Sequence, residues 1–289
     1  MDIICFGNAT KDIFVHIKPK ISGKKIFFSL GEKTEISQLE HFSGGGATNA
    51  SVGFSRLGKK TGIVTVVGND LEAKEIISEL KKEKVNTFGI FKDKKTSTSC
   101  SVILTGFGMD RVVLSYSKAI NALAKHHIPW NQLKPKWFYI SSLHANPALI
   151  EKIVSFAARH KIKVALNAGA KEIAGGIKSL EPIFKKIDIL ILNAEEAQAL
   201  CGHKKIKQNL AELSAHSKIA VITDGANGSF AQSGEKIFSQ KAFPVKVVDA
   251  TGAGDAFACA FVASIIDGKP IEFALKAGTA NASSVIQFL

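Results

Sequence analysis

Residues 248–257, VDATGAGDAF, place two glycines and two aspartates where an apolar run gives way to a helical pattern. Small residues at a tight corner let a ligand approach the backbone closely. The first turn of a helix also has N–H groups without intrahelical acceptors, and these groups favour an anion. A carboxylate there, Asp255, could take a proton beside a phosphate. The stretch therefore predicts a phosphate-binding corner between a β-like run, PVKVV (244–248), and an apolar helix over 254–266.

Outside this corner, apolar runs alternate with amphipathic stretches for most of the chain. Buried strands are expected at 3–7, 61–68, 136–143, 162–169 and 218–225, with another opening the stretch 187–197. Helices are expected at 48–58, 71–83 and 147–160. This alternation predicts an α/β fold in which a mostly parallel central sheet is covered by helices on both faces.

Two segments, 12–42 and 92–116, are richer in β-branched residues and alternate like half-exposed strands. Within the second, GFGMD (106–110) is typical of a hairpin turn. We expect these segments to form a small β-sheet lid over the main sheet, where it could exclude water from a reaction. With no linker or repeat in view, residues 1–289 are expected to form a single domain.

The amino-acid composition, with 46% hydrophobic and 22% charged residues, is typical of a soluble globular protein with a substantial core. No run of 18 apolar residues suggests a membrane span, and the N-terminus lacks the basic region of a signal peptide. A cytoplasmic location is therefore expected. The four cysteines are scattered and read as buried, reduced thiols.

A formal net charge of +13 raises the question of nucleic-acid binding. The basic residues are mostly lysines, spread in short groups among acids, and no nucleic-acid-binding motif accompanies them. We expect a solvated lysine surface and no nucleic-acid partner. The positive field would help to recruit an anionic nucleotide.

Three further polar or glycine-rich stretches matter in combination. SGGGATN (43–49) offers an open backbone and an amide, although alone it could be a turn before a helix. In ILNAEEA (191–197), polar residues end a buried strand, which is where parallel sheets bind ligands; alternatively Asn193 caps a helix. VITDGANGS (221–229) is another strand running into glycines.

Together with GNATKD (7–12) and the stretch 249–255, and in their order along the chain, these motifs resemble those of one family. It is the ribokinase-like, or phosphofructokinase-B-type, family of carbohydrate and nucleoside kinases. The resemblance covers essentially the whole chain, and the stretch 249–255 is its most specific part. It implies a ribokinase-like three-layer α/β/α domain with a small β lid. It also implies an ATP-dependent kinase that phosphorylates a hydroxyl of a sugar or related small carbohydrate.

The resemblance also implies roles for individual residues. Asp255 would be the catalytic base and would contact the acceptor, with the amides of Gly252, Ala253 and Gly254 as the anion hole. Other acceptor-binding residues would be Asn8, Asp12, Gly44, Gly45 and Asn49. Arg111 on the lid could reach over the acceptor, or could be an exposed hairpin arginine. His144 stands where ribokinases tend to carry a sugar-binding acid, so it could bind the acceptor or be a loop histidine.

For the donor, the resemblance implies an ATP site and two cations. The ATP site would comprise Asn167, Asn193, Thr223, Gly225, Gly228, Gly252, Gly254 and, near the adenine, Asn281. Glu196 would organise Mg²⁺ through water, in line with the preference of that ion for oxygen ligands and water. Asp249 and Thr251 could offer oxygens to K⁺, although many relatives complete that site with a glycine-containing tail beyond the position of Leu289.

Two alternatives to a sugar kinase remain. A nucleoside kinase of the adenosine or inosine type would need an aromatic lining on the lid, for which Phe14, Phe27, Phe28 and Phe107 are candidates. A non-catalytic sugar or nucleotide sensor would be marked by loss of the base or the anion-hole glycines, and both are present. Because related lids sometimes pair, a homodimer through the lid is also considered.

Overall fold

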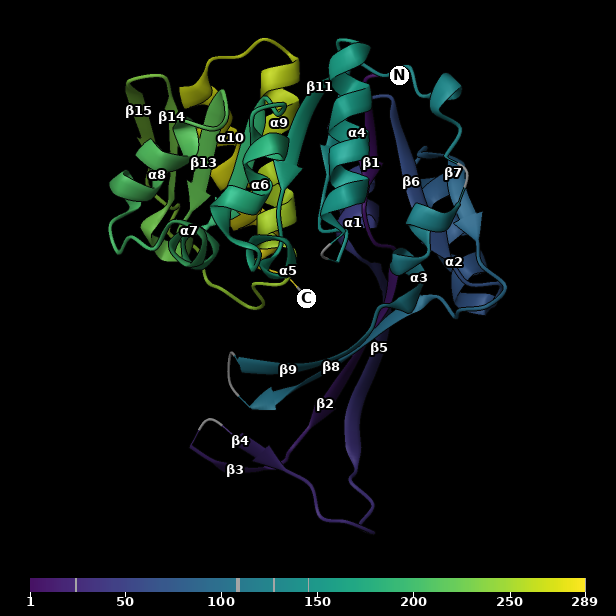
Figure 1. Cartoon of the computed structure of the whole chain (residues 1–289). Coiled ribbons are helices and arrows are strands. Elements are labelled where there is room, and N and C mark those ends of the chain that lie inside the picture. The colour runs from purple at the N-terminus through teal and green to yellow at the C-terminus, as the bar shows by residue number, and fades with distance from the viewer. Residues whose placement is uncertain (24, 108–109, 127, 145, 289) are drawn as a thin grey trace.

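The computed structural model describes residues 1–289 except 24, 108–109, 127, 145 and 289. Its larger sheet has nine strands (Figure 1). In spatial order they are β15 (Lys236–Gln240), β14 (Ser229–Ser233), β13 (Ile219–Thr223), β12 (Ile189–Asn193), β11 (Lys163–Asn167), β10 (Trp137–Ile140), β1 (Ile3–Phe6), β6 (Thr61–Val67) and β7 (Asn86–Lys92). From β13 to β7 all pairs are parallel, and β14 and β15 pair antiparallel.

Helices cover both faces of this sheet, as the strand sequences require. In β1, Ile4 and Phe6 point into one core cluster, while Ile3 and Cys5 point into the other. A strand buried on both faces has no polar side, which explains its continuous apolar run. The expected three-layer arrangement with a mostly parallel central sheet is confirmed.

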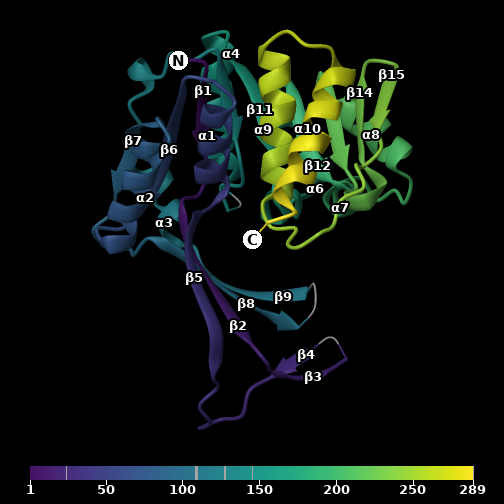
Figure 2. The ribbon, with the colours of Figure 1, turned by 180° about the vertical axis from the view of Figure 1, so that it is seen from behind.

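On the face toward the viewer in Figure 1 lie α3 (Lys118–Asn121), α4 (Pro147–Arg159), α5 (Ala170–Ile173), α6 (Gly176–Phe184), α7 (Ala194–Cys201) and α8 (Ile206–Ser214). On the face seen in Figure 2 lie α1 (Gly46–Arg56), α2 (Leu71–Lys82), α9 (Ala253–Ile266) and α10 (Ile271–Val285). Three single-turn helices, η1 (Leu123–Lys125), η2 (Trp130–Gln132) and η3 (Gly225–Asn227), lie in connections.

The chain reverses its direction of travel across the sheet between β1 and β10. From β1 it adds β6 and β7 on one side, and then β10 to β13 on the other. Ligands of open α/β sheets bind at such a switch point, beyond the carboxyl ends of the strands. Gly7 and Ser141, which follow β1 and β10, mark that point here.

A second, four-stranded sheet extends from this same edge (Figures 1 and 2), and we call it the lid. Its order is β5 (Ile36–Gly44), β2 (Thr10–Ile17), β8 (Ser99–Phe107) and β9 (Asp110–Tyr116), with a hairpin of β3 (Lys20–Ser22) and β4 (Lys25–Phe27) beyond it. The pair β2–β8 is parallel, so the sheet is mixed. The turn expected at 106–110 lies partly outside the described residues.

One expected strand is wrong. PVKVV (244–248) has no strand pairing, and residues 241–250 form a connection without regular secondary structure instead. The amides of Val248 and Asp249 both donate to the carbonyl of Ile286, at the end of α10, at 2.7 and 3.3 Å. This contact with a helix end takes the place of a β ladder and overrides the preference of valines for strands.

Candidate active site

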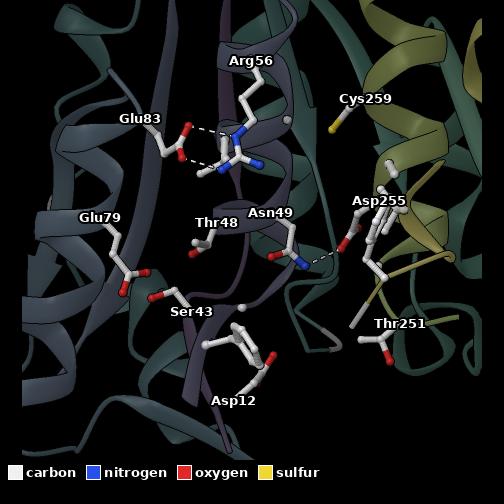
Figure 3. A pocket seen from close by; sticks show the side chains of 18 of the residues that line it. Asp12, Ser43, Thr48, Asn49, Arg56, Glu79, Glu83, Thr251, Asp255 and Cys259 are labelled. Carbon is white, nitrogen blue, oxygen red and sulfur yellow. Dashed lines mark hydrogen bonds and ion pairs between the residues drawn. The ribbon is translucent and has the colours of Figure 1, made fainter. Parts of the chain in front are cut away.

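A cavity of about 910 Å³ lies between the base of the lid, α1 and the start of α9 (Figure 3). Asp12 enters it from the lid, Asn49 from α1 and Asp255 from α9. Other walls are formed by Phe14, Phe42, Ser43, Gly44, Thr48, Arg56, Glu79, Asp249, Thr251, Gly252 and Asn281. Residues from five separate parts of the sequence therefore meet at the switch point of the large sheet.

Asp255 lies in the first turn of α9 and accepts a hydrogen bond from Asn49. The distance from Asn49 Nδ2 to Asp255 Oδ2 is 2.8 Å, and Figure 3 shows the two side chains pointing toward each other. Burial raises the pKa of the Asp255 carboxyl, and the hydrogen bond from Asn49 acts in the opposite direction. The site thus holds a carboxylate that is a stronger base than an exposed aspartate.

The backbone before Asp255 forms an open corner. Gly252 has φ 78° and is the N-cap of α9, a left-handed conformation that glycine adopts without steric cost. Within the described chain the amides of Gly252 and Gly254 have no hydrogen-bond acceptor, and a Cβ at Gly254 would meet nothing within 4 Å. Ala253 differs, because its amide donates to the Ala250 carbonyl at 3.3 Å. This corner can bind an anion at the positive end of α9.

Asp12 lies on the opposite side of the cavity, at the base of the lid. Its carboxylate lies so close to Gly44 that a Cβ added there would be 1.9 Å from Asp12 Oδ2. Burial raises the pKa of Asp12, while a hydrogen bond from Ser101 of the adjacent strand lowers it. Gly44 is therefore needed for the position of this carboxylate, which explains the first glycine of GGGATN.

The second glycine, Gly45, brings the loop against the end of β1. It has φ 92°, and a Cβ there would lie 2.5 Å from the Asn8 carbonyl oxygen. Asn8 donates from Nδ2 to Thr10 Oγ1 at 2.8 Å, while its Oδ1 is buried without a partner among the described residues. Neither Asn8 nor Gly45 is among the described residues that line the cavity.

The predicted ATP residues lie along the carboxyl ends of the next strands. Asn193 caps α7 by accepting from the Glu196 amide at 2.8 Å, and Glu196 accepts from the Asn193 amide at 2.9 Å. Asn193 also stands beside Thr223 in the sheet register, and Asn167 donates to the Ile191 carbonyl at 3.1 Å. These four side chains thus share one edge, and the capping role considered for Asn193 is observed.

Burial raises the pKa of Glu196, with further raising by Glu172 and Glu195 and an opposing hydrogen bond from Asn193. Among the described residues, no three His, Cys, Asp or Glu side chains are grouped to hold a metal ion. Glu196 supplies carboxylate oxygens, which are ligands of the kind that Mg²⁺ prefers.

Gly225 and Gly228 form the turn after β13, with φ 48° and 100°. The Asp224 amide donates to the Gly228 carbonyl at 2.8 Å. A Cβ at Gly228 would lie 2.1 Å from the Gln240 carbonyl oxygen, so the close approach of β15 requires glycine there.

Asn281, Asp249 and Thr251 all line the cavity that contains Asp255. Asn281 donates to the carbonyl of Ala256 at 2.8 Å. Asp249 Oδ1 accepts from the Thr251 amide at 2.6 Å, and Thr251 Oγ1 is buried without a described partner. An unpaired oxygen beside a carboxylate fits a monovalent cation.

His144 and Arg111 are not among the described residues that line the cavity. His144 follows β10 with φ 55°, and its Nδ1 lies 3.4 Å from Lys171 Nζ. Its pKa is lowered by burial and by Lys171. Arg111 is exposed on β9, where strand alternation places it on the same face of the lid as Val113 and hence of Ile103 and Asp12.

Sequence reasoning missed two features of this edge. Phe42 lines the cavity and packs edge-to-face on Phe14 with ring centroids 5.6 Å apart, whereas Phe27 and Phe28 are half exposed. Glu172 is a buried carboxylate that accepts from Ser142 Oγ at 2.9 Å and from the Leu143 amide at 2.8 Å. An acid five residues after the Asn167 strand end was the available signal.

A carboxylate beside open helix-start amides, at the switch point of a doubly covered parallel sheet, is an arrangement that suits phosphoryl transfer to a small molecule. Comparisons then specify the family. Residues 3–288 match the family described as "pfkB family carbohydrate kinase". The chain belongs to this family, and it is a sugar kinase whose acceptor is a hydroxyl group; use of ATP is implied by the family.

The chain is also similar to individual proteins. The chain is similar to the 5-dehydro-2-deoxygluconokinase of Bacillus licheniformis, with 28% identity over 263 residues, covering 85% of this chain and 81% of that one. Among solved structures, it is similar to the ribokinase of Thermotoga maritima (24% identity, TM-score 0.84, 100% and 93% of the chains). The nucleoside kinase of Methanocaldococcus jannaschii has the same TM-score of 0.84, at 20% identity and 100% and 92% coverage. In the described part of the chain, no helix has the length and apolarity that crossing a membrane requires.

Proposed function

We propose that Asp255 is the base of this kinase. It would take the proton of an acceptor hydroxyl while the hydroxyl oxygen attacks the γ-phosphorus of ATP, the bond from that phosphorus to the bridging β–γ oxygen breaks, and ADP leaves. The observation that carries this proposal is the position of Asp255: it lies one residue beyond the open amide of Gly254, in the cavity that also contains Asp12. A raised pKa makes its carboxylate a better proton acceptor than an ordinary aspartate.

Charge on the transferring phosphoryl group would be stabilised by the corner before Asp255. In phosphoryl transfer, most catalysis comes from positioning and from preorganised donors around the equatorial oxygens. The amides of Gly252 and Gly254 are available for this role. The Ala253 amide would join them by exchanging its long bond to the Ala250 carbonyl for one to the phosphoryl group.

The acceptor would bind between α1 and the lid, and the donor along the carboxyl ends of β11 to β13. We propose that the acceptor binds to Asp12, Asn8, Asn49 and the backbone at Gly44 and Gly45. ATP would contact Asn167, Asn193, Thr223, Gly225, Gly228 and Asn281. Glu196 would hold Mg²⁺ through water beside the phosphates, and Asp249 with Thr251 would hold K⁺ near the anion corner.

A nucleoside acceptor is the second candidate. The aromatic pair Phe14 and Phe42, on the cavity side of the lid, is the observation that favours it, because a base could stack there. The names of the similar proteins include both sugar and nucleoside kinases.

The remaining proposals concern the location of the enzyme, its oligomeric state and two further residues. We propose a cytoplasmic protein, and a homodimer formed by the lid, where the aliphatic side chains of Leu39 and Leu114 are 53% and 56% exposed. Arg111, on the cavity side, would approach the acceptor, and His144 would border it. Sedimentation of the purified chain as a monomer at micromolar concentration would contradict the dimer.

The test is Mg²⁺- and ATP-dependent phosphorylation across a panel of sugars and nucleosides, with Asp255→Asn beside the natural sequence. We expect kcat to fall about 10²- to 10⁴-fold, the usual contribution of a general base, while ATP binding by calorimetry stays near normal. Asp267→Asn, at the opposite end of the same helix, is the matched control. Unchanged turnover in Asp255→Asn would contradict the assigned base.

A further inference from the structure

Glu172 is a buried carboxylate at the carboxyl edge of the large sheet, and the proposed reaction gives it no role. It lies in α5, the short helix that follows β11, and is 5% exposed. Burial and the charge of Glu172 raise the pKa of Glu196, so Glu172 also lies near the proposed donor side of the site. A carboxylate is retained in such a position where donors satisfy its oxygens.

Donors to Glu172 come from two different loops. The Gly169 amide, in the loop that leads into α5, donates to Glu172 Oε2 at 3.2 Å and completes a capping box. Two shorter bonds come from the loop after β10: Ser142 Oγ donates to Oε2 at 2.9 Å, and the Leu143 amide donates to Oε1 at 2.8 Å. Capping of α5 accounts for the first bond but not for the other two, which join the end of β10 to the helix after β11.

The two loops are in close contact beside this carboxylate. A Cβ at Gly169 would lie 3.0 Å from Ser142 Cβ and 3.2 Å from Glu172 Oε2. The His144 amide in turn donates to Ser142 Oγ at 3.3 Å. Glu172 therefore holds residues 142–144, either directly or through the Ser142 hydroxyl.

The residue before this segment, Ser141, fills the space at the switch point of the sheet. It is 3% exposed, and its amide and its Oγ both donate to the Phe6 carbonyl, at 2.9 and 3.1 Å. A Cβ at Gly7 would lie 1.9 Å from Ser141 Oγ, and one at Gly46 would lie 2.6 Å from it. Any displacement of the loop after β10 would therefore reach Gly46, the first residue of α1.

The start of α1 carries the acceptor side of the cavity. Gly44, two residues before α1, and Asn49, three residues after Gly46, both line the cavity. The Asn49 amide donates to the Gly45 carbonyl at 2.9 Å, and its side chain donates to Asp255. A shift of Gly46 would therefore move Asn49 relative to the proposed base.

We propose that Glu172 is a positioning residue for the acceptor side of the site. It holds the loop after β10 against the start of α1, and so keeps Asn49 in place beside Asp255. Glu172 is not among the described residues that line the cavity, so it acts through Ser142, Ser141 and Gly46. This inference rests on the proposed function and deepens it, because it adds a residue that aligns the acceptor.

Glu172→Gln tests this role, because it keeps the size of the side chain but leaves one acceptor oxygen in place of two. KM is measured for ATP and for ribose, glucose and adenosine as acceptors. We expect KM for the acceptor to rise about tenfold, as for a binding group displaced by a fraction of an ångström, with KM for ATP within about twofold of its original value. Equal rises in both constants, or a rise in neither, overturn the inference.

Asp188→Asn is the matched control. Asp188 also accepts a backbone hydrogen bond between neighbouring strands, from the Val164 amide at 2.8 Å, but it lies at the amino edge of the sheet, just before β12. Both variants should lose stability in chemical denaturation, and only Glu172→Gln should raise the acceptor KM. A similar rise in Asp188→Asn would reflect a general loss of packing and would overturn the positioning role.

Ser142→Ala removes one donor to the carboxylate and is the milder variant. It should raise the acceptor KM by itself, yet add little in the Glu172→Gln background, because both changes release the same loop. Full additivity would mean that Ser142 does not act through Glu172 and would overturn the proposed route. If Glu172→Gln does not fold, Ser142→Ala is used for the same measurements.

Hydrogen exchange read by mass spectrometry tests the inference without turnover. In Glu172→Gln, peptides that cover 141–144 and 46–49 should exchange at least about tenfold faster than in the natural sequence, since both segments lose support. Unchanged exchange at 46–49 overturns the inference even if the kinase reaction is demonstrated. Faster exchange there upholds the positioning of α1 by Glu172 even if no sugar or nucleoside is phosphorylated.

Discussion

The large sheet and the lid are built from similar apolar residues but bury them very differently. In β1 the four side chains from Ile3 to Phe6 are at most 1% exposed, because helices cover both faces. In the lid, Leu39, Phe42 and Leu114 are 53%, 41% and 56% exposed, and the small cluster around Val15, Ile17 and Leu104 is the main apolar contact. Apolar residues therefore stabilise the large sheet, while in the lid they remain available for contact with a ligand or a partner.

The proposed base and the proposed acceptor-binding acid lie in one cavity at the border between these regions. Asp12 belongs to the lid and Asp255 to the body, and burial raises the pKa of both. Discrete polar contacts join the two parts: Lys11 of β2 pairs with Glu75 of α2 at 2.7 Å, and the Thr98 amide, just before β8, donates to Asp70 at 2.7 Å. A weakly packed lid held at its base can change position without disturbing the main core.

The largest expected effect comes from equal truncations in the two regions. Leu190→Ala, in the fully buried strand β12, should lower the free energy of unfolding by about 2–5 kcal/mol. Leu114→Ala, in the exposed face of the lid, should change it by only about 0.5 kcal/mol, as for other surface sites. Chemical denaturation followed by circular dichroism measures both. Similar losses would mean that the lid is as well packed as the body.

An intermediate effect is expected at the contact between the two regions. Gly44→Ala introduces a Cβ 1.9 Å from Asp12 Oδ2, so the carboxylate must move. We expect KM for the acceptor to rise about 10- to 100-fold, the cost of misplacing a binding group by about 1 Å, with KM for ATP nearly constant. In an Asp12→Ala background the same substitution should add little, because its effect acts through Asp12. Additive losses would show that Gly44 acts independently.

These differences also determine what the sequence could predict. Strands buried on both faces, such as 3–6 and 61–67, appear as continuous apolar runs, and their positions were predicted within one or two residues. PVKVV (244–248) has the same composition but no ladder, because its partner is the end of α10. Whether a neighbouring strand is present is decided by the tertiary fold, and local composition does not contain that information.

The same limit applies to the site. Glycine and acid patterns located the corner at 252–255 and the loop at 44–49, since tight backbone approach leaves few alternatives to glycine. The hydrogen bond from Asn49 to Asp255 joins residues 206 positions apart, and neither spacing nor periodicity contains it. For the same reason the pairing of Phe14 with Phe42 required the structure, although Phe14 itself was a candidate.

The smallest expected effect is a shift in the pH dependence of turnover. Asp255 must be ionised to accept a proton, so kcat should fall as the pH drops through its pKa in the folded enzyme. Because burial raises that pKa, the fall should begin at a higher pH than for an exposed aspartate, whose pKa is about 3.9. Asn49 opposes this shift by donating to the ionised form.

Asn49→Ala should therefore raise the pKa of Asp255 and move the acid limb of kcat to higher pH. Measuring kcat at saturating acceptor across pH separates this shift from any loss of acceptor binding. Asn86→Ala removes an exposed amide that caps a turn on β7 and should leave the limb in place. A limb that stays fixed in Asn49→Ala would mean that this contact, which joins α1 to α9 at the base of the lid, does not control the ionisation of Asp255.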